Sequence, residues 1–322
     1  MESPVSIVYS PHYDIRLGGI EKLHPFDACK YSRAWESLHY AFGTRLEDAL
    51  VEPDAPATDE LLQLVHSEKY LSSLQKSSAI ASALELPAMR LLPGFVLQKH
   101  VVGPMRYAVQ GTLIAARKAL QHGIAVNLSG GYHHASQQHG EGFCLFADVG
   151  VAVAALRDEG LLDSQDQVVI IDLDAHQGNG NEHVFRDDPR VLIMDMYNKD
   201  IYPQDPLARE RIDLDVPVIS GIGDEAYLAT LKEVLPGFLR HIERPRLLFY
   251  NAGTDILARD PLGAMNVSAR GVFARDVFVF NLLIELKIPF VLLPSGGYTR
   301  SSYKLLADSV HYLLRTVQAP LH

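Results

Sequence analysis

Cysteine is almost absent from this chain, with only Cys29 and Cys144 among 322 residues. The two lie far apart and outside any CxxC pair, so the sequence predicts neither a disulfide framework nor a thiolate zinc site. This scarcity fits a reducing compartment. The first residues also lack the basic stretch and apolar run of a secretory signal, so we expect a cytoplasmic protein.

Clustered positive charge and long apolar runs are missing as well. The net charge is −10 and no Lys- and Arg-rich patch is present, so no nucleic-acid partner is expected. The most apolar stretch is residues 277–294. Because it contains Glu285, Lys287 and Pro289, a helix followed by a strand explains it better than a membrane span.

Short apolar runs alternate with amphipathic segments along the chain. Four runs have strand character and lead into glycine-containing polar turns: residues 124–128, 168–171, 247–250 and 290–293. Helix-like segments lie between them, at residues 148–160, 224–242 and 268–286 and before Gly123. This alternation favours an α/β fold with a parallel sheet covered on both faces. The length suggests two domains, yet nothing marks a boundary.

Polar side chains follow all four apolar runs. They are His133 and His134, Asp174 and His176, Asp255, and Tyr298. In parallel sheets the ligand site lies outside the carboxyl ends of the strands, so one site could collect all of them. The alternative is that each is a solvated loop residue.

The segment IIDLDAHQGNG, residues 170–180, places Asp172, Asp174 and His176 two apart, on one side of an extended chain. Burying such a set is costly unless a cation is present. Asp174 and His176 together with Asp255 would offer two oxygens and one nitrogen. That set suits a catalytic zinc with an open position for water, although the ligand types also allow Fe(II) or Mn(II).

Two adjacent histidines, His133 and His134, offer a general base, and the preceding glycine pair permits the irregular backbone they need. Asp172 could orient one imidazole and stabilise its protonated form. Asn179 could hold the other without adding charge, so we predict unlike pKa values for the two rings. The phenol of Tyr298 could donate a hydrogen bond to a carbonyl oxygen as it becomes tetrahedral.

Two other catalytic motifs are incomplete. Gly178 and Gly180 could begin a dinucleotide fingerprint, but His183 stands at the position of its third glycine. The G-x-S-x-G motif of serine hydrolases is absent from the sequence.

Five motifs together resemble the histone deacetylase family within the arginase/deacetylase fold. They are SGGYHHA (129–135), GFC (142–144), DLDAHQGNG (172–180), NAGTD (251–255) and SGGYTR (295–300). The stretches IVYSPHYD, EKLHPFDACK and MDMYNKDIYPQD are similar to the class IV branch. The resemblance implies one α/β domain over residues 1–322, with three α/β/α layers around a parallel sheet of about eight strands.

The resemblance also implies roles for individual residues. Zinc would bind Asp174, His176 and Asp255, with His133, His134, Tyr298, Asp172 and Asn179 as the catalytic set. A structural potassium would bind Asp172, Asp174, His176, Asp195 and Met196, and a second monovalent ion would lie near Phe185. The substrate channel would be lined by Gly142, Phe143, Tyr202 and Leu262.

The activity implied by the resemblance is zinc-dependent removal of acetyl or longer fatty acyl groups from lysine side chains of a peptide or protein. A small acylated amine such as an acetylpolyamine is an alternative substrate, and a non-catalytic scaffold is a third reading. Dinuclear manganese relatives need further carboxylates where Gly178 and Gly253 stand. Asn179 replaces the aspartate of class I enzymes, and the glycines flanking Glu141 would leave room beside the metal for a longer chain.

Overall fold

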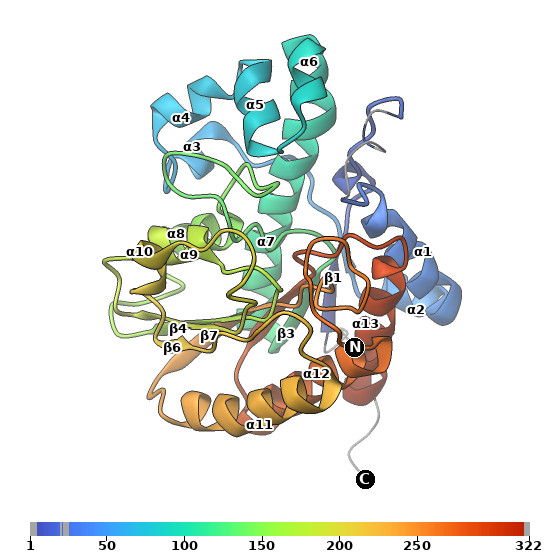
Figure 1. The fold of residues 1–322 in the computed structure, drawn as a ribbon, viewed down its shortest axis with the longest axis vertical. Coiled ribbons are helices and arrows are strands. Elements are labelled where there is room, and N and C mark those ends of the chain that lie inside the picture. Colours follow the sequence, from blue (N-terminus) through green and yellow to red (C-terminus); the bar gives the residue numbers. More distant parts are fainter. Residues whose placement is uncertain (1–4, 20, 22–25, 319–322) are drawn as a thin grey trace.

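The computed structural model describes residues 5–19, 21 and 26–318, in which eight strands form one parallel sheet (Figure 1). The strands are β1 (Val5–Val8), β2 (Leu50–Val51), β3 (Ile124–Asn127), β4 (Gln167–Asp172), β5 (Val191–Asp195), β6 (Leu214–Asp215), β7 (Pro245–Asn251) and β8 (Phe290–Leu293). Their spatial order is β2-β1-β3-β8-β7-β4-β5-β6. The predicted α/β fold with a parallel sheet of about eight strands is therefore confirmed.

Helices cover both faces of the sheet. One face carries α7 (Gly103–His122) and α8 (Asp148–Asp158), and the other carries α1 (Lys30–Phe42), α11 (Asp224–Arg240), α12 (Ala269–Leu286) and α13 (Ser302–Gln318). Successive residues of a strand point to opposite faces. Accordingly, Val168 and Ile170 of β4 pack in the core beneath α7 and α8, while Val169 and Ile171 pack in the core on the other face.

Shorter helices occupy the connections. They are α2 (Thr44–Glu47), α3 (Asp59–Leu62), α4 (Glu68–Ser73), α5 (Ser77–Ala83), α6 (Gly94–Leu97), α9 (Asn179–Val184), α10 (Pro206–Arg209), the 3₁₀ helices η1 (Pro11–Tyr13) and η3 (Pro87–Leu91), and the π-helix η4 (Gln98–Val102). In Figure 1, α3 to α6 gather beyond the sheet at one end of α7. None of the helices in the described ranges is long and apolar enough to cross a membrane.

Local sequence explains where the long helices begin and end. The side chain of Ser268 caps α12 by accepting a hydrogen bond from the backbone N–H of Gly271. The same helix ends at Lys287, which has the left-handed conformation common after helices, two residues before Pro289. The predicted segment 268–286 therefore agrees closely with α12.

The four strands whose ends carry the polar clusters are neighbours, in the order β3, β8, β7, β4. Their ends are also level, because Asp172 pairs with Asn251 and Asn251 pairs with Leu293. The loops that follow these strands consequently leave the sheet side by side. This arrangement places the polar clusters within reach of one another.

Candidate active site

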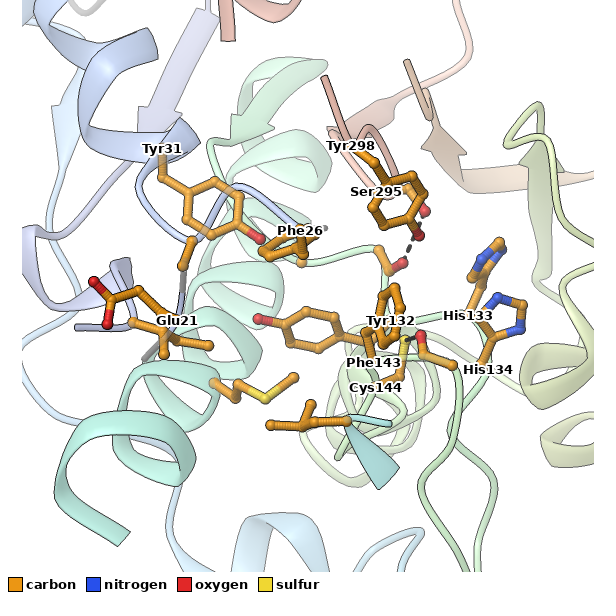
Figure 2. A pocket seen from close by; sticks show the side chains of 18 of the residues that line it. Glu21, Phe26, Tyr31, Tyr132, His133, His134, Phe143, Cys144, Ser295 and Tyr298 are labelled. Carbon is orange, nitrogen blue, oxygen red and sulfur yellow. Dashed lines mark hydrogen bonds between the residues drawn. The ribbon is translucent and has the colours of Figure 1, made fainter. Parts of the chain in front are cut away.

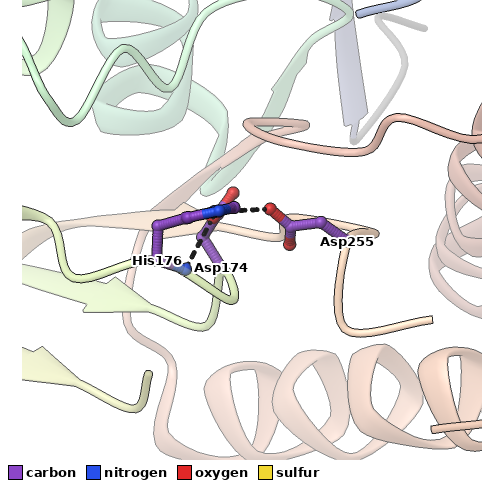
Figure 3. A group of neighbouring side chains, drawn as sticks. All are labelled: Asp174, His176 and Asp255. Carbon is purple, nitrogen blue, oxygen red and sulfur yellow. Dashed lines mark hydrogen bonds and ion pairs between the residues drawn. The ribbon is translucent and has the colours of Figure 1, made fainter. Parts of the chain in front are cut away.

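Three buried side chains converge beyond the ends of β4 and β7 (Figure 3). One ligand atom each from Asp174, His176 and Asp255 lies within 4.8 Å of the others. The Nδ1 atom of His176 is 3.0 Å from Asp174 Oδ1 and 3.0 Å from Asp255 Oδ2. The sequence prediction named these three residues as a group, and the fold brings them together.

The donor set fits a divalent cation. Burial and the neighbouring charge of Asp174 raise the pKa of Asp255 to about 7. Burial alone would lower the pKa of His176, but the two carboxylates raise it to about 10. The group therefore attracts positive charge, and two oxygens with one imidazole nitrogen match a catalytic zinc site.

Backbone atoms hold the two carboxylates in place. The N–H of Gly296 donates to Asp174 Oδ2 at 2.7 Å, and the N–H of Ala175 donates to Asp255 Oδ1 at 2.9 Å. A Cβ atom at Gly253 or Gly296 would collide with a carboxylate oxygen of the group. Glycine at these positions allows the backbone to approach the acidic groups closely.

A buried arginine on α12 ties together the two loops that bear the carboxylates. Arg275 Nη1 donates to the carbonyl oxygens of Leu173 (3.0 Å) and Gly253 (2.6 Å), and Nη2 donates to that of Ala252 (3.2 Å). Its charge is balanced by Asp276, 2.8 Å from Nε. The sequence carries no signal for this residue, because α12 also carries Arg270 and Glu285 and nothing distinguishes Arg275 and Asp276 from a surface ion pair.

The two histidines receive different partners. His133 Nδ1 lies 2.9 Å from Asp172 Oδ2, whereas His134 Nδ1 lies 2.7 Å from Asn179 Oδ1. Burial alone would lower the pKa of His133, but the charges of Asp172 and Asp174 raise it to about 9. Burial, with His133 nearby, lowers the pKa of His134 well below its usual value. The two pKa values thus move in opposite directions, as the unequal partners predict.

The loop that bears the histidines is held by a buried aspartate. Asp148, the first residue of α8, accepts hydrogen bonds from the backbone N–H groups of Gly131 (2.9 Å) and Tyr132 (2.8 Å). Its Oδ2 also accepts from the hydroxyl of Thr112 at 2.7 Å. The sequence suggested only that residue 148 begins a helix, so its role in shaping this loop was not predicted.

Tyr298 and the histidine pair line one pocket (Figure 2). The pocket is partly open to solvent, and most of its lining is apolar. The Tyr298 ring lies 5.7 Å from that of Phe143 and 6.0 Å from that of His176. Burial and the charges of Asp174 and Asp255 raise the pKa of Tyr298 well above its usual value, so its phenol stays protonated and can donate.

The four predicted channel residues are placed unequally. Gly142 and Phe143 line the pocket, while Tyr202 packs its ring 5.2 Å from that of His134 and is 41% exposed. Tyr202 and Leu262 are not among the described residues that line the pocket. A Cβ atom at Gly142 would collide with the His134 ring, so glycine at this position makes room for the imidazole.

A buried lysine lies behind the last strand end. Lys30 Nζ donates to the carbonyl oxygens of Ser295 (2.5 Å) and Gly296 (3.3 Å). Burial lowers its pKa to about 8, while nearby carboxylates, among them Asp255, oppose that shift. Lys30 thus supports the segment that carries Tyr298. It was missed because nothing in the sequence distinguishes it from a surface lysine.

The residues predicted to bind potassium lie beside β5, together with a further buried acid. Burial raises the pKa of Glu182 to about 7 and that of Asp195 well above its usual value. The two carboxyls are hydrogen-bond neighbours, and no N–H or hydroxyl donor among the described residues reaches Asp195 Oδ1 or Glu182 Oε1, although both atoms are buried. The Asp172 carbonyl accepts a hydrogen bond from the N–H of Met196 at 3.0 Å, which brings these two residues together.

The predicted second monovalent site near Phe185 is already filled by a cation of the chain. Arg211 Nε donates to the Phe185 carbonyl at 2.8 Å, and Nη2 donates to the carbonyls of Asp188 (2.9 Å) and Val191. These oxygens would otherwise be ligands for a monovalent ion. Because the guanidinium already donates to these carbonyl oxygens, the structure does not support the expected second ion at this position.

Comparison with known proteins agrees with this geometry. A protein-family model described as "Histone deacetylase domain" matches residues 24–315 of the chain. Histone deacetylase 2 of Arabidopsis thaliana is 47% identical over 315 residues, covering 97% of this chain and 79% of that protein. An uncharacterized protein of Picosynechococcus sp. is 31% identical, covering 93% of this chain and 94% of its own.

A solved structure shares the fold. The HD domain of HDA15 matches 99% of this chain and 91% of its own, with a TM-score of 0.75 and 20% sequence identity. The chain therefore has the arginase/deacetylase fold, a single parallel sheet with helices on both faces. Among proteins with this fold, the chain belongs to the histone deacetylase family, a family of hydrolases.

Proposed function

We propose that this chain is a zinc-dependent amidohydrolase that removes acyl groups from lysine side chains. The observation that carries the proposal is the convergence of Asp174, His176 and Asp255 beside the pocket lined by the histidine pair and Tyr298. When bound, zinc would polarise the acyl carbonyl and make a water more acidic. The remaining chemistry falls to side chains of the chain.

The histidines divide the proton transfers. His134 is held by an amide that adds no charge, so it stays neutral and can accept the proton of the attacking water. His133 is stabilised in its protonated form by Asp172 and can donate to the lysine amine as it leaves. Tyr298, kept protonated, donates to the carbonyl oxygen as negative charge develops there.

We also propose one structural monovalent cation, potassium, at Asp172, Asp174, His176, Asp195 and Met196. The unpaired buried oxygens of Asp195 and Glu182 support it, because a cation would offset their mutual repulsion. Glu182 would contribute to this charge balance. Carboxylate and carbonyl oxygens of this kind suit a hard cation better than zinc.

The pocket bears on the substrate. Its apolar lining, which includes Phe26, Leu84, Met89 and Met105, could accommodate an aliphatic chain longer than acetyl. The substrate would then be an acetyl- or fatty-acyl-lysine peptide or protein, with acetylpolyamines as the alternative. Glycine at position 253, packed against Asp174, leaves no room for the extra carboxylate of a dinuclear site.

The single sheet supports the proposal that residues 1–322 form one catalytic domain. Assignment to the class IV branch rests on the motifs near the N-terminus and after β5, and it stays a prediction. The cytoplasmic location stays a prediction as well.

A substrate panel tests the proposed function. The zinc-loaded chain would be offered lysine peptides with acyl groups of two to sixteen carbons, together with acetylputrescine. We expect hydrolysis of at least one acyl-lysine peptide, with a higher kcat/KM than for acetylputrescine. Faster turnover of acetylputrescine would favour the small-amine reading, and inactivity on every acyl-lysine substrate would refute the proposal.

A further inference from the structure

A third side chain stands behind the pair formed by His134 and Asn179. The Nδ2 atom of Asn179 donates to Glu141 Oε1 at 2.6 Å, while its Oδ1 faces His134 Nδ1 at 2.7 Å. We propose that Glu141 is a positioning residue that fixes the orientation of the Asn179 amide and, through it, the tautomer of His134. This inference rests on the proposed function, in which His134 accepts a proton.

The hydrogen-bonding chemistry of Glu141, Asn179 and His134 allows the Asn179 amide only one orientation. An ionised carboxylate only accepts hydrogen bonds, so the amide must turn its NH₂ end toward Glu141. Its oxygen then faces His134 and requires a proton on Nδ1. The other ring nitrogen, Nε2, is left as the acceptor. With the amide reversed, two oxygens would meet at the 2.6 Å contact with no proton between them.

The neighbouring histidine has no need of such a third member. His133 Nδ1 faces a carboxylate of Asp172, and both oxygens of a carboxylate accept, so any rotation selects the same tautomer. An amide has one accepting and one donating end and could satisfy either tautomer of His134. Replacing a carboxylate by an amide therefore creates an ambiguity, which Glu141 removes.

The fold holds Glu141 in a tight turn pressed against the His134 ring. The turn is closed by the N–H of Cys144, which donates to the Glu141 carbonyl at 2.9 Å. Its two central residues, Gly142 and Phe143, have φ values of 53° and 68°. The N–H of Phe143 is fixed by the Ala83 carbonyl at 3.1 Å. One turn thus positions both the carboxylate behind Asn179 and an aromatic wall of the pocket.

Glu141 also lies near two further polar side chains, those of His139 and Tyr202. Its side chain is 33% exposed, and His139 Nε2 lies 3.6 Å from Oε1. Burial, with the Glu141 carboxylate nearby, raises the pKa of the Tyr202 hydroxyl, so the two groups are neighbours. Replacing an ordinary surface glutamate would not be expected to change kcat. Glu141 differs because its hydrogen bond to Asn179 continues to the ring of His134, a proposed catalytic histidine.

A double-substitution test separates positioning from general support. We expect Glu141→Ala to lower kcat about 10-fold, within the range for groups that orient a reacting side chain, with KM little changed. Glu141→Gln should lower kcat less, because its oxygen can still accept from Asn179. In the Asn179→Asp background the effect of Glu141→Gln on kcat should have the opposite sign. There the native glutamate faces a second carboxylate, so Glu141→Gln should raise kcat several-fold.

The matched control is Glu210→Gln, an exposed glutamate paired with Arg186, which should leave kcat unchanged. The inference is overturned, while the proposed function stands, if Glu141→Ala has the same kcat as the active wild type. It is also overturned if Glu141→Gln changes kcat equally in the wild-type and Asn179→Asp backgrounds. Inactivity of the wild type on all acyl-lysine peptides would overturn the proposed function instead.

Nitrogen-15 spectra of histidine-labelled chain provide a readout without turnover, with the His134 signals assigned by their loss in His134→Gln. The wild type should show the tautomer protonated at Nδ1, and Glu141→Ala should show a mixture of tautomers. An unchanged tautomer in Glu141→Ala would overturn the inference whether or not the wild type is active.

Discussion

The two halves of the site are stabilised by opposite charges. In the metal half, formed by Asp174, His176 and Asp255, the buried cation Arg275 donates to three backbone carbonyls. In the histidine half, formed by His133 and His134, the buried carboxylate of Asp148 accepts hydrogen bonds from two backbone N–H groups. Loops at strand ends leave both backbone carbonyls and backbone N–H groups without partners in the sheet. In the metal half a cation pairs with the free carbonyls, and in the histidine half an anion pairs with the free N–H groups. Substitutions of the supporting residue in one half should therefore leave the supporting contacts of the other half in place.

Asp174→Ala should give the largest effect. It removes a ligand of the metal half and one of the charges that raise the pKa of His133. Removing one of three ligands and its charge should abolish zinc binding and detectable turnover. The histidine half should stay folded, because Asp148 does not contact Asp174. The measurement is zinc content by atomic emission with turnover on the same sample, and Asp308→Ala on the exposed face of α13 is the control. Retention of one zinc per chain would contradict the ligand assignment.

Tyr298→Phe should separate chemistry from metal binding. Loss of the phenol should lower kcat by about 10²–10³, as for other donors to a developing oxyanion. Zinc content should not change, since Tyr298 is not in the ligand group. Tyr303→Phe, a half-buried tyrosine on α13, is the matched control. Equal kcat of Tyr298→Phe and wild type would remove the tyrosine from the mechanism.

Arg275→Met and Asp148→Asn compare the supports of the two halves. Arg275→Met should weaken zinc affinity by about 10–100-fold, as expected when groups that orient ligands are lost. Asp148→Asn should lower kcat by about 10-fold with zinc affinity unchanged, because it loosens only the histidine loop. Competition with a chromophoric chelator measures the affinities. If both variants changed zinc affinity alike, the halves would not be independent.

A fully folded protein is required for that comparison. Loss of the Arg275 charge leaves the buried Asp276 without its cationic partner, with only the hydroxyls of Tyr250 and Ser309 donating to it. Breaking a buried ion pair in this way costs about 3–5 kcal/mol of stability. Arg275→Lys keeps the charge but offers fewer directed donors. It should fold normally and show a smaller loss of zinc affinity than Arg275→Met.

A pH effect on stability should come from His66, a buried histidine outside the two halves of the site. His66 Nε2 accepts from the backbone N–H of Ala147, next to Asp148, and burial lowers the pKa of His66 to about 4. Between that value and the unfolded pKa of about 6.5, only the unfolded chain binds the proton, so stability falls as pH falls. This group alone should account for about 2 kcal/mol of the loss between pH 7 and pH 5.

Urea unfolding at the two pH values measures this contribution. His66→Gln, whose side-chain oxygen can accept the same hydrogen bond, should show a smaller difference between pH 7 and pH 5 than the wild type does. An equal difference in both proteins would mean that His66 is not the titrating group. Activity at pH 7 should be almost unaffected.

Sequence patterns predicted the parts of the site that depend on chain order. The four apolar runs became β3, β4, β7 and β8, and their polar ends meet because parallel strands end at one edge. Residue spacing in DLDAHQGNG was equally informative, since two-residue steps set the side that each group faces.

Other features could not be read from one sequence. Arg275 and Asp276 on α12 resemble a surface ion pair, and only the packing of α12 under the strand ends turns both side chains inward. Glu141 looks like a loop residue until the turn places it behind Asn179. The close packing of Gly142 against His134 was not predicted, because it depends on distances that residue order does not give.

Zinc titration of metal-depleted chain, followed by hydrolysis of an acyl-lysine peptide, tests the central claim most directly. Activity should be absent without metal, rise in proportion to added zinc and saturate at one equivalent per chain, and Asp255→Ala should stay inactive throughout. Full turnover by the metal-free wild type, or zinc-restored turnover in Asp255→Ala, would contradict the account.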